Sequence, residues 1–446
     1  MRAILAIARL TLREAIRSRL VIAIILLLLL VTLGLPALLT GDGTPIGLIR
    51  MTISYTLAVA FGLLAVATLW TGCALVSGDI AARTLALVRV KPVGIWQLWL
   101  GKWIGLLLLN LLVLTGLYSL TLLSVYRQMA RQPAATAVMR TARRMVKPDL
   151  PPLASQIDSV FNQLQGGGLP PREQRDLRRR LRAELPFQPA SLQRGLSWNW
   201  TFTLDRPPDP GRPVWLRFRF DTDAYTRAWV RADCRLAGAA SGAGVDFVLD
   251  DFSTRVFEVP LAAGDLGTDT VFTLTMTHTG DETTGPLLLQ PRQGLDLLVP
   301  RATLPGNALR AALLHFALLA VLAAIGVTCG TLFSLPVAAF CATGLLLAVV
   351  ISSFVAEDAE ALHDAAEVEC PGFTQRVFTP FAIQTTRWLS AAAQPTLASS
   401  PLRSLAASEL IPREALRHAV AVNLLLLPIV CCGVAALVLR RRELPG

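Results

Sequence analysis

The stretch Leu20–Leu39 reads LVIAIILLLLLVTLGLPALL and contains no charged side chain. An α-helix rises about 1.5 Å per residue and the hydrocarbon core of a bilayer is about 30 Å thick, so about 20 apolar residues cross it. The sequence therefore predicts an α-helical polytopic membrane protein with six transmembrane helices. The other apolar runs of this kind are Thr52–Val76, Trp103–Val125, Asn307–Thr331, Pro336–Phe354 and Arg417–Leu439.

Composition and charge placement agree with a membrane location. Hydrophobic residues make up 53% of the chain and charged residues only 16%, against about 25% charged in a typical soluble domain. The net charge is +11, but no basic stripe is interleaved with aromatic residues, so nucleic acid is not expected as a partner. Three basic groups precede the first run, separate the second from the third and follow the last: Arg2, Arg9, Arg13, Arg17 and Arg19; Arg83, Arg89, Lys91 and Lys102; and Arg440, Arg441 and Arg442.

Six crossings place all three basic groups on one side, as the positive-inside rule requires. We therefore expect a multi-pass protein of the bacterial cytoplasmic (inner) membrane, with the N and C termini in the cytoplasm. The run Val21–Leu39 is longer than the usual core of about 7–15 residues in a secretory signal, so the first span is expected to be retained.

The residues before the first span carry an amphipathic pattern. At 100° per residue, four arginines share an arc of about 80° and apolar residues fill much of the rest. This predicts a helix in the cytoplasmic membrane interface over residues 1–19, anchored to lipid by Arg2, Arg9, Arg13 and Arg17. An ordinary basic flank that only sets the topology stays an equal alternative.

The remaining sequence divides by composition and period. Prolines at helix starts and a glycine break at 166–168 predict helices before residue 195, and apolar/polar alternation after Leu196 predicts an antiparallel sandwich of seven or eight strands. The predicted regions are transmembrane helices 1–3 with a loop at 77–102 (20–126), an extracytoplasmic helical segment (127–195), an extracytoplasmic β-sandwich (196–305), transmembrane helices 4 and 5 (306–355), a second extracytoplasmic segment (356–416), and transmembrane helix 6 with a basic tail (417–446).

Two details of the external segments stay open. The strand tryptophans Trp198, Trp200, Trp215 and Trp229 could stack on a sugar, although core packing is favoured. Cys234 and Cys370 are the two cysteines in external segments, so they could form a disulfide. The acidic stretch 357–364 holds ligand-type side chains, but a solvated acidic helix is favoured over a cation site, and no metal site is predicted.

Catalytic and nucleotide-binding motifs are missing from the sequence. Gly101-Lys102-Trp103 resembles the end of a phosphate-binding loop, but position 96 is Trp instead of Gly and Trp103 replaces the required Ser or Thr. The apolar runs carry almost none of the ionisable residues expected of an ion relay. The chain is therefore expected not to be an enzyme, and energy for any transport is expected from another subunit.

The loop between the second and third runs suggests which subunit would supply this energy. It contains Ser77-Gly78-Asp79, Arg83-Thr84-Leu85, Pro92-Val93 and Gly101-Lys102. The order of these motifs resembles that of the ABC-2 type ABC transporter permease family, in insert-bearing bacterial form. The basic helix before the first span, the six-span count and the stretch 333–338 also resemble that family. The resemblance covers the membrane part, about half of the chain.

The resemblance implies a permease that pairs with a second permease copy and with a separate ATP-binding-cassette ATPase. ATP and Mg would be bound by that ATPase, and no cofactor by this chain. A short helix from about Asp79 to Val90 would act as the coupling helix; a basic helix bound to lipid headgroups is the alternative. The residues expected to dock the ATPase are Asp79, Arg83, Thr84, Arg89, Lys91, Pro92 and Gln97.

The expected function is export of a substrate that the sequence does not identify, driven by ATP hydrolysis in the partner. One alternative is a mechanical transmitter that rearranges its extracytoplasmic domain, or a partner, without moving a substrate. Another is a membrane-anchored extracytoplasmic binding or assembly module, although a single span would serve as an anchor. An intramembrane enzyme is the weakest reading, since no catalytic pair is evident in the runs.

Overall fold

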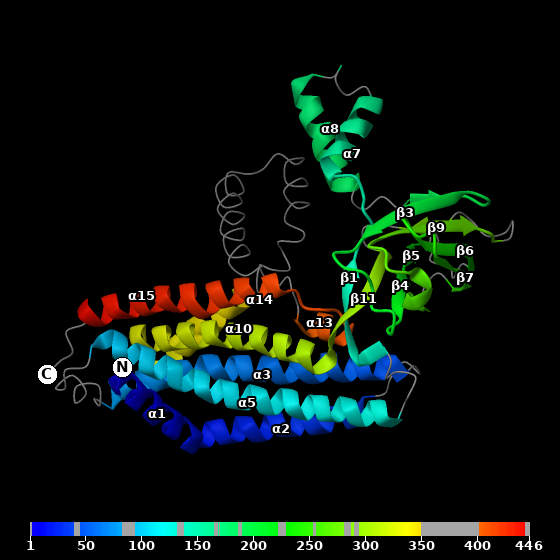
Figure 1. Cartoon of the computed structure of the whole chain (residues 1–446). Coiled ribbons are helices and arrows are strands. Elements are labelled where there is room, and N and C mark those ends of the chain that lie inside the picture. Colours follow the sequence, from blue (N-terminus) through cyan, green and yellow to red (C-terminus); the bar gives the residue numbers. More distant parts are fainter. Residues whose placement is uncertain are drawn as a thin grey trace. The chain divides into compact units, whose positions relative to one another are not determined.

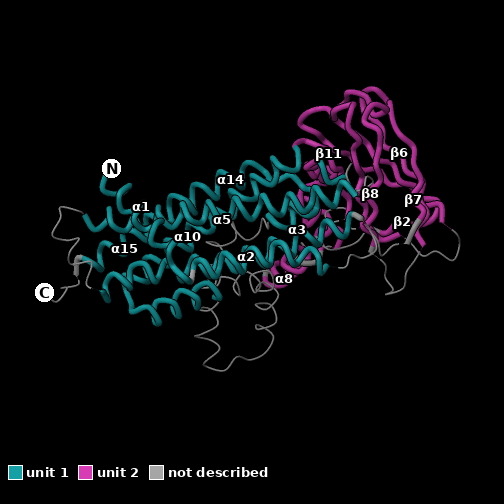
Figure 2. Tube along the Cα trace, turned by 90° about the horizontal axis from the view of Figure 1, so that it is seen from below, with its two compact units in different colours: residues 1–140, 303–446 teal, residues 141–302 magenta. Residues whose placement is uncertain are grey.

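The structure is a computed structural model. It describes residues 2–39, 45–82, 94–131, 138–164, 168, 170–185, 190–221, 229–252, 256–280, 287–289, 294–348 and 401–441. The chain divides into two compact units, one made of Met1–Arg140 with Thr303–Gly446 and the other of Thr141–Ala302 (Figure 2). The second unit is therefore an insertion into the first.

Within the described residues, five helices of the first unit are long and apolar enough to cross a membrane. Four of them, α2, α3, α5 and α10, run side by side (Figure 1). The chain is thus a multi-pass membrane protein. The five are α2 (Arg19–Leu38), α3 (Pro45–Ala81), α5 (Ile95–Arg131), α10 (Leu304–Leu332) and a C-terminal helix made of α14 (Arg413–Ala419), the π-helical η4 (Val420–Leu426) and α15 (Leu427–Arg441).

The sixth expected span, Pro336–Phe354, is only partly described. An apolar helix covers Leu335–Ala348, and at about 1.5 Å per residue it is roughly 20 Å long, less than the hydrocarbon thickness of about 30 Å. The rest of that run, and residues 356–400 of the second external segment, lie outside the described residues. The described residues thus contain five candidate spans, and the sixth stays a prediction.

Glycines allow α3 and α10 to cross at close range. A Cβ atom on Gly326 would lie 2.4 Å from the carbonyl oxygen of Leu69, and one on Gly330 would lie 2.5 Å from that of Cys73. Small residues spaced four apart let helix backbones approach in membranes, where packing replaces the hydrophobic effect as the force between helices. This crossing is the centre of the buried core of the helical unit.

Polar contacts hold a short segment before α14 against the start of α10. The helix α13 (Pro401–Ala406) lies beside α3 and α10. Asn307 donates from its side-chain amide to the Glu409 carbonyl at 2.7 Å and accepts from the Ile411 backbone N–H at 3.0 Å. The Arg310 guanidinium donates to the Ile411 carbonyl at 2.9 Å. The segment before α14 is thereby fixed to α10.

The segment 127–195 is only partly helical. The helices α7 (Leu153–Gln163) and α8 (Pro171–Glu184) pack through Ile157, Phe161 and Leu181, as predicted. However, Thr141–Val146 forms a strand, β1, and Ala190–Leu192 forms a short strand, β2. The basic stretch with Arg143 was expected in a helix, but Arg143 is fully buried and donates to Glu258 at 2.8 Å, a tertiary contact that local periodicity cannot reveal.

Two four-stranded antiparallel sheets form most of the second unit. The first has the order β1–β11–β4–β8, with β11 (Leu295–Thr303), β4 (Val214–Phe218) and β8 (Phe257–Leu261). The second has the order β3–β9–β6–β7, with β3 (Ser197–Thr203), β9 (Val271–His278), β6 (Trp229–Gly238) and β7 (Gly244–Phe252). A small third sheet joins β2, β10 (Leu287–Leu289) and β5 (Phe220–Asp221).

The alternating pattern of the strands is confirmed by their burial. In β6 and β9 every second side chain is buried, including Leu236 and Leu274. The inward side chains of both large sheets form one hydrophobic core. Trp200 and Trp215 are buried, as expected for core packing, whereas Trp229 is 47% exposed.

The possible disulfide between Cys234 and Cys370 is not tested, because Cys370 lies outside the described residues. Cys234 is buried on β6 and pairs with no other described cysteine. Burial, with a smaller contribution from Asp233, raises the pKa of its thiol to about 12.

Candidate functional site

The candidate site is the end of the helical unit where α3 and α5 enter the loop predicted to dock an ATPase. Of the expected docking residues, Asp79 lies in the last turn of α3 and Gln97 in the first turn of α5. Arg83, Thr84, Arg89, Lys91 and Pro92 lie outside the described residues. Asp79 therefore ends the long helix α3 rather than beginning a separate helix.

Gln97 caps the start of α5. Its side-chain carbonyl accepts from the Gly94 backbone N–H at 3.3 Å, and its own backbone N–H donates to the Gly94 carbonyl at 2.9 Å. This reciprocal pairing of a residue before the helix with a Gln three positions later satisfies groups that a helix start leaves open. Gln97 thus has a structural role, apart from any docking role.

Lys102 and Asp79 form an ion pair that joins α5 to α3. The Lys102 ammonium lies 2.5 Å from an Asp79 carboxylate oxygen and donates to the Leu75 carbonyl at 2.6 Å. The Lys102 side chain is 5% exposed and that of Asp79 is 29% exposed. Lys102 was counted with the basic residues facing the cytoplasm, but it points into the bundle. There α3 offers its ammonium group two oxygen acceptors, the Asp79 carboxylate and the Leu75 carbonyl.

The amino-terminal helix α1 (Arg2–Arg17) packs on the same end of α5. A Cβ atom on Gly101 would lie 2.7 Å from Cβ of Ile7, and one on Gly105 would lie 2.7 Å from Cβ of Thr11. Ala8, Thr11 and Ala15 form the buried face of α1. The expected helix is confirmed, and one face of it is covered by α5 instead of lipid.

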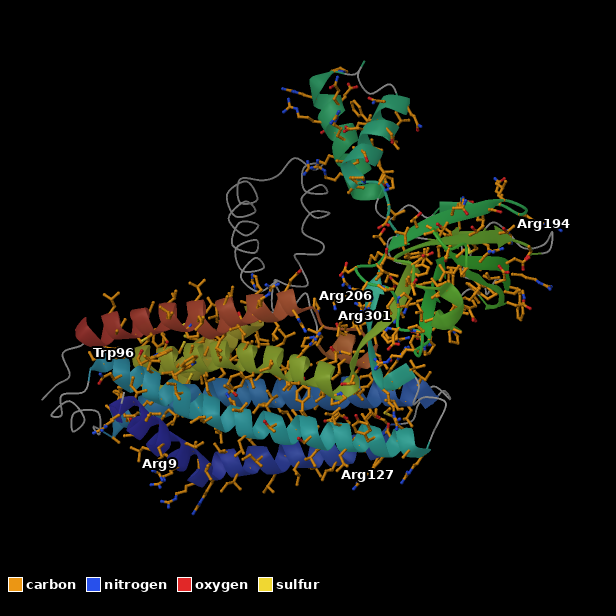
Figure 3. All side chains as sticks on the ribbon, in the orientation of Figure 1. Arg9, Trp96, Arg127, Arg194, Arg206 and Arg301 are labelled. Carbon is orange, nitrogen blue, oxygen red and sulfur yellow. The ribbon has the colours of Figure 1, made fainter. Side chains whose placement is uncertain are left out.

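All four arginines assigned to membrane anchoring are exposed on α1: Arg2, Arg9, Arg13 and Arg17. In Figure 3, Arg9 lies on the outer side of α1, while Trp96 and Arg127 mark opposite ends of α5. The arginine arc is therefore on the face away from α5, where lipid phosphates or a partner protein could reach it.

Two tryptophans one turn apart connect α5 to α10. The indole N–H of Trp99 donates to the Thr328 hydroxyl at 3.2 Å, and that of Trp103 donates to the Ala320 carbonyl at 2.9 Å. Thr328 in turn donates to the Cys431 carbonyl of α15 at 3.3 Å. The first turns of α5 are therefore joined by hydrogen bonds to α10 and, through Thr328, α10 is joined to α15.

The interior of the bundle also contains polar pairs that the sequence did not indicate. The Tyr118 hydroxyl lies 2.6 Å from Nδ1 of His315, and the imidazole stacks on Phe61 with ring centroids 4.0 Å apart. Deeper along the same helices, the Thr68 hydroxyl donates to Asn110 at 2.9 Å. A single histidine in an apolar run has no periodic signal, so only the packing of α3, α5 and α10 brings these groups together.

The charged residues at this end of α3 and α5 have partners within the helical unit. Lys102, the lysine of the Gly-Lys pair that resembles a phosphate loop, is engaged by Asp79 and a carbonyl oxygen. Among the described residues, no cluster of three His, Cys, Asp or Glu side chains could hold a metal ion. These residues join the ends of α1, α3, α5 and α10 through close packing, an ion pair and hydrogen bonds.

Comparison of the chain with protein-family models found no match, and comparisons with curated proteins and with solved structures found none either.

Proposed function

We propose that this protein is the permease subunit of an ABC-2 type ABC transporter. In this proposal a separate cytoplasmic ATPase binds and hydrolyses ATP with Mg, and the loop at residues 83–93 receives the motion of that subunit. A second permease copy completes the transporter, and the substrate is exported from the cytoplasm or its inner leaflet. The proposal starts from the order of short motifs in residues 77–102 and from the multi-pass membrane unit.

One observation carries the proposal: the loop 83–93 begins and ends on helices that are locked together. Asp79 and Lys102 tie the two helix ends at 2.5 Å, and Gly101 and Gly105 bring α1 against α5. In this proposal a force on the loop would be transmitted through these contacts to α1, α3 and α5, as transmission by rigid-body rotation requires. A loop that served only to connect two spans would need no such bracing.

The proposed topology has six spans, with both termini and the loop 83–93 in the cytoplasm. The helix Leu335–Ala348 would be completed by residues after 348. Five crossings would separate the basic group before α2 from the arginines at 440–442, against the positive-inside rule. Single cysteines at Ser241 and Ser18, in a variant without native cysteines, test this with an impermeant thiol reagent on intact spheroplasts. Ser241 should label and Ser18 should not; the reverse pattern contradicts the topology.

The docking role is tested by co-purification with the ATP-binding-cassette protein encoded nearest to this gene. Arg83→Glu should weaken association by about tenfold or more, because a repulsive charge at an interface costs a few kcal/mol and about 1.4 kcal/mol is tenfold in affinity. Arg413→Glu, an exposed arginine at the start of α14, is the matched control and should leave association unchanged.

Replacement of the loop provides the result that could contradict the docking role. A Gly/Ser linker in place of residues 83–93 leaves Asp79, Gln97 and Lys102 intact, so the helix ends stay braced. If the ATPase still co-purifies and its ATP hydrolysis still responds to the permease, the loop does not dock it and the proposal fails.

A further inference from the structure

A cleft lined by two arginines lies at the end of α3 opposite to Asp79. Its volume is about 510 Å³, within the range of about 300–1,000 Å³ typical of small-molecule sites. One wall is a stripe of α3 and the other is the short helix α13. The lining residues are Arg50, Ser54, Tyr55, Ala58, Leu402, Arg403, Ala406 and Ala407.

The position of the cleft relative to the membrane follows from the charged residues of α3. Arg50 and Asp79 are consecutive charged residues of this helix, with none between them. They are 29 positions apart (79 − 50), or roughly 44 Å along a helix, which matches the thickness of about 40–45 Å of a bilayer with its headgroup layers. Arg50 therefore lies at the level of the lipid headgroups.

The side chains of the cleft suit a phosphate group. Arg50 and Arg403 each bring a planar guanidinium to the lining. A guanidinium has five N–H donors, so it can bind phosphate oxygens in a bidentate manner beside another partner. The ring of Tyr55 is 54% exposed, and tyrosine is enriched at the membrane–water interface, where it offers a hydroxyl beside an apolar ring. Ser54 adds a second hydroxyl, and three alanines leave the space open.

The short helix α13 is held in place, so the cleft is a built feature of the fold. Pro401, Leu405 and Ala406 are buried, and the contacts of Asn307 with Glu409 and Ile411 fix the chain that follows. Arg403 is exposed on the face of α13 that lines the cleft. The two arginines thus come from segments some 350 positions apart in sequence (403 − 50 = 353), and they meet only through the tertiary structure.

We propose that this cleft binds a phosphate group, supplied by an anionic phospholipid headgroup or by free phosphate. The inference depends on the membrane location of the helices and not on the ATPase-coupled function. Both sources share the same recognition chemistry, two guanidinium groups and two hydroxyls. They differ in the acyl chains, for which the apolar lining residues Ala58, Leu402 and Ala406 would provide contacts.

The test uses the purified full chain in neutral detergent with three probes: phosphatidylglycerol, phosphatidylcholine and inorganic phosphate. Binding is measured by native mass spectrometry and by the shift in unfolding temperature. Phosphatidylglycerol should stay bound to the wild-type chain. The double variant Arg50→Gln/Arg403→Gln should bind it about 30-fold more weakly, since each of the two basic residues at a membrane surface contributes about 1 kcal/mol.

The matched control is Arg127→Gln/Arg131→Gln. Arg127 and Arg131 are exposed at the end of α5, next to the start of α3, as the hydrogen bond between Gln128 and Thr52 at 3.2 Å shows. This control removes the same charge at the same depth. It should bind phosphatidylglycerol within about twofold of wild type; an equal loss in both double variants would mean a non-specific surface charge effect and would overturn the proposal.

The probes also separate the two sources. A response to phosphatidylglycerol without a response to inorganic phosphate identifies a lipid headgroup, and the opposite result identifies free phosphate. If neither probe distinguishes the Arg50/Arg403 variant from wild type, the proposal is wrong. Should that variant not fold, Ala58→Trp fills the cleft without changing the charge; a chain with this substitution that binds both probes like wild type equally overturns the proposal.

Discussion

The ammonium group of Lys102 and the carboxylate of Asp79 lie 2.5 Å apart, each contributed by the charged residue of its helix nearest to the loop 83–93. The lysine is almost fully buried, so its charge depends on this carboxylate and on the Leu75 carbonyl. Breaking one side of a buried ion pair is costly because the other charge stays uncompensated. The pair therefore ties the end of α3 to the start of α5.

Loss of this pair should destabilise the membrane unit. We expect Asp79→Asn to lower the free energy of unfolding by about 3 kcal/mol, at the lower end for a buried pair because Asp79 is partly exposed. Unfolding in mixed micelles measures the change. Arg19→Gln, which removes an exposed charge at the start of α2, should change it by less than about 1 kcal/mol. A similar loss in both variants would mean that the ion pair has no special role.

The close crossing of α3 and α10 should not tolerate a methyl group. In Gly326→Ala the new Cβ would meet the Leu69 carbonyl at 2.4 Å, so the helices must separate, at a cost of about 1–3 kcal/mol. Gly116→Ala on α5 is the control, because nothing lies within 4 Å of its Cβ position. It should be neutral or stabilising by up to about 1 kcal/mol through helix propensity. Equal stability of the two variants would contradict the close approach.

Neighbouring arginines on β1 should differ sharply in their effect on the second unit. Arg143 is fully buried, pairs with Glu258 at 2.8 Å and lies 5.1 Å from the ring centre of Trp215. Arg143→Ala should cost about 1.5–3 kcal/mol, because it removes a charge-assisted hydrogen bond to Glu258, which keeps Arg217 as a partner at 3.2 Å. Arg144 is half exposed and pairs with Asp205, so Arg144→Ala should cost less than about 1 kcal/mol.

Hydrogen exchange in the full chain measures this difference locally. Peptides from β4 and β8 should lose protection in Arg143→Ala and keep it in Arg144→Ala, because β4 pairs directly with β8 in the sheet that holds Glu258. Equal protection in both variants would show that the buried arginine is dispensable.

His278 should make the second unit sensitive to mild acid. Its side chain is 1% exposed, and burial, followed by the positive charge of Arg194, lowers the pKa of His278 below its ordinary value. The folded state therefore favours the neutral imidazole. The stability this contributes is complete above the unfolded-state pKa of about 6.5 and is lost as the pH falls through the folded-state pKa.

The measurement is hydrogen exchange of β9 between pH 7 and pH 5, corrected for the intrinsic exchange rate. Protection should fall in the wild type and change less in His278→Gln, which cannot titrate. His418→Gln, at an exposed position, should behave like the wild type. A His278→Gln chain with the full wild-type pH response would assign the sensitivity to another group.

The long apolar helices and the alternating strands could be predicted from the sequence because they reflect local hydrophobic patterns. A run as long and as apolar as Leu20–Leu39 predicts a membrane-spanning helix, and α2 covers nearly the same residues. The strands around Trp200 and Leu274 were predicted for a similar reason, since one face of a sheet must be apolar. The helix before the first span was also expected, although its packing on α5 was not.

The tertiary structure alone decided where the charged and polar side chains go. Arg143 was read as part of a basic helix and lies buried in a sheet, and Lys102 was read as a cytoplasmic charge and points at Asp79. Tyr118 meets His315, and Arg50 shares a cleft with Arg403, across 197 and 353 positions of sequence. A local pattern records the hydrophobic period of one element, whereas the free energy of a charged group depends on partners that only the packing of distant elements supplies.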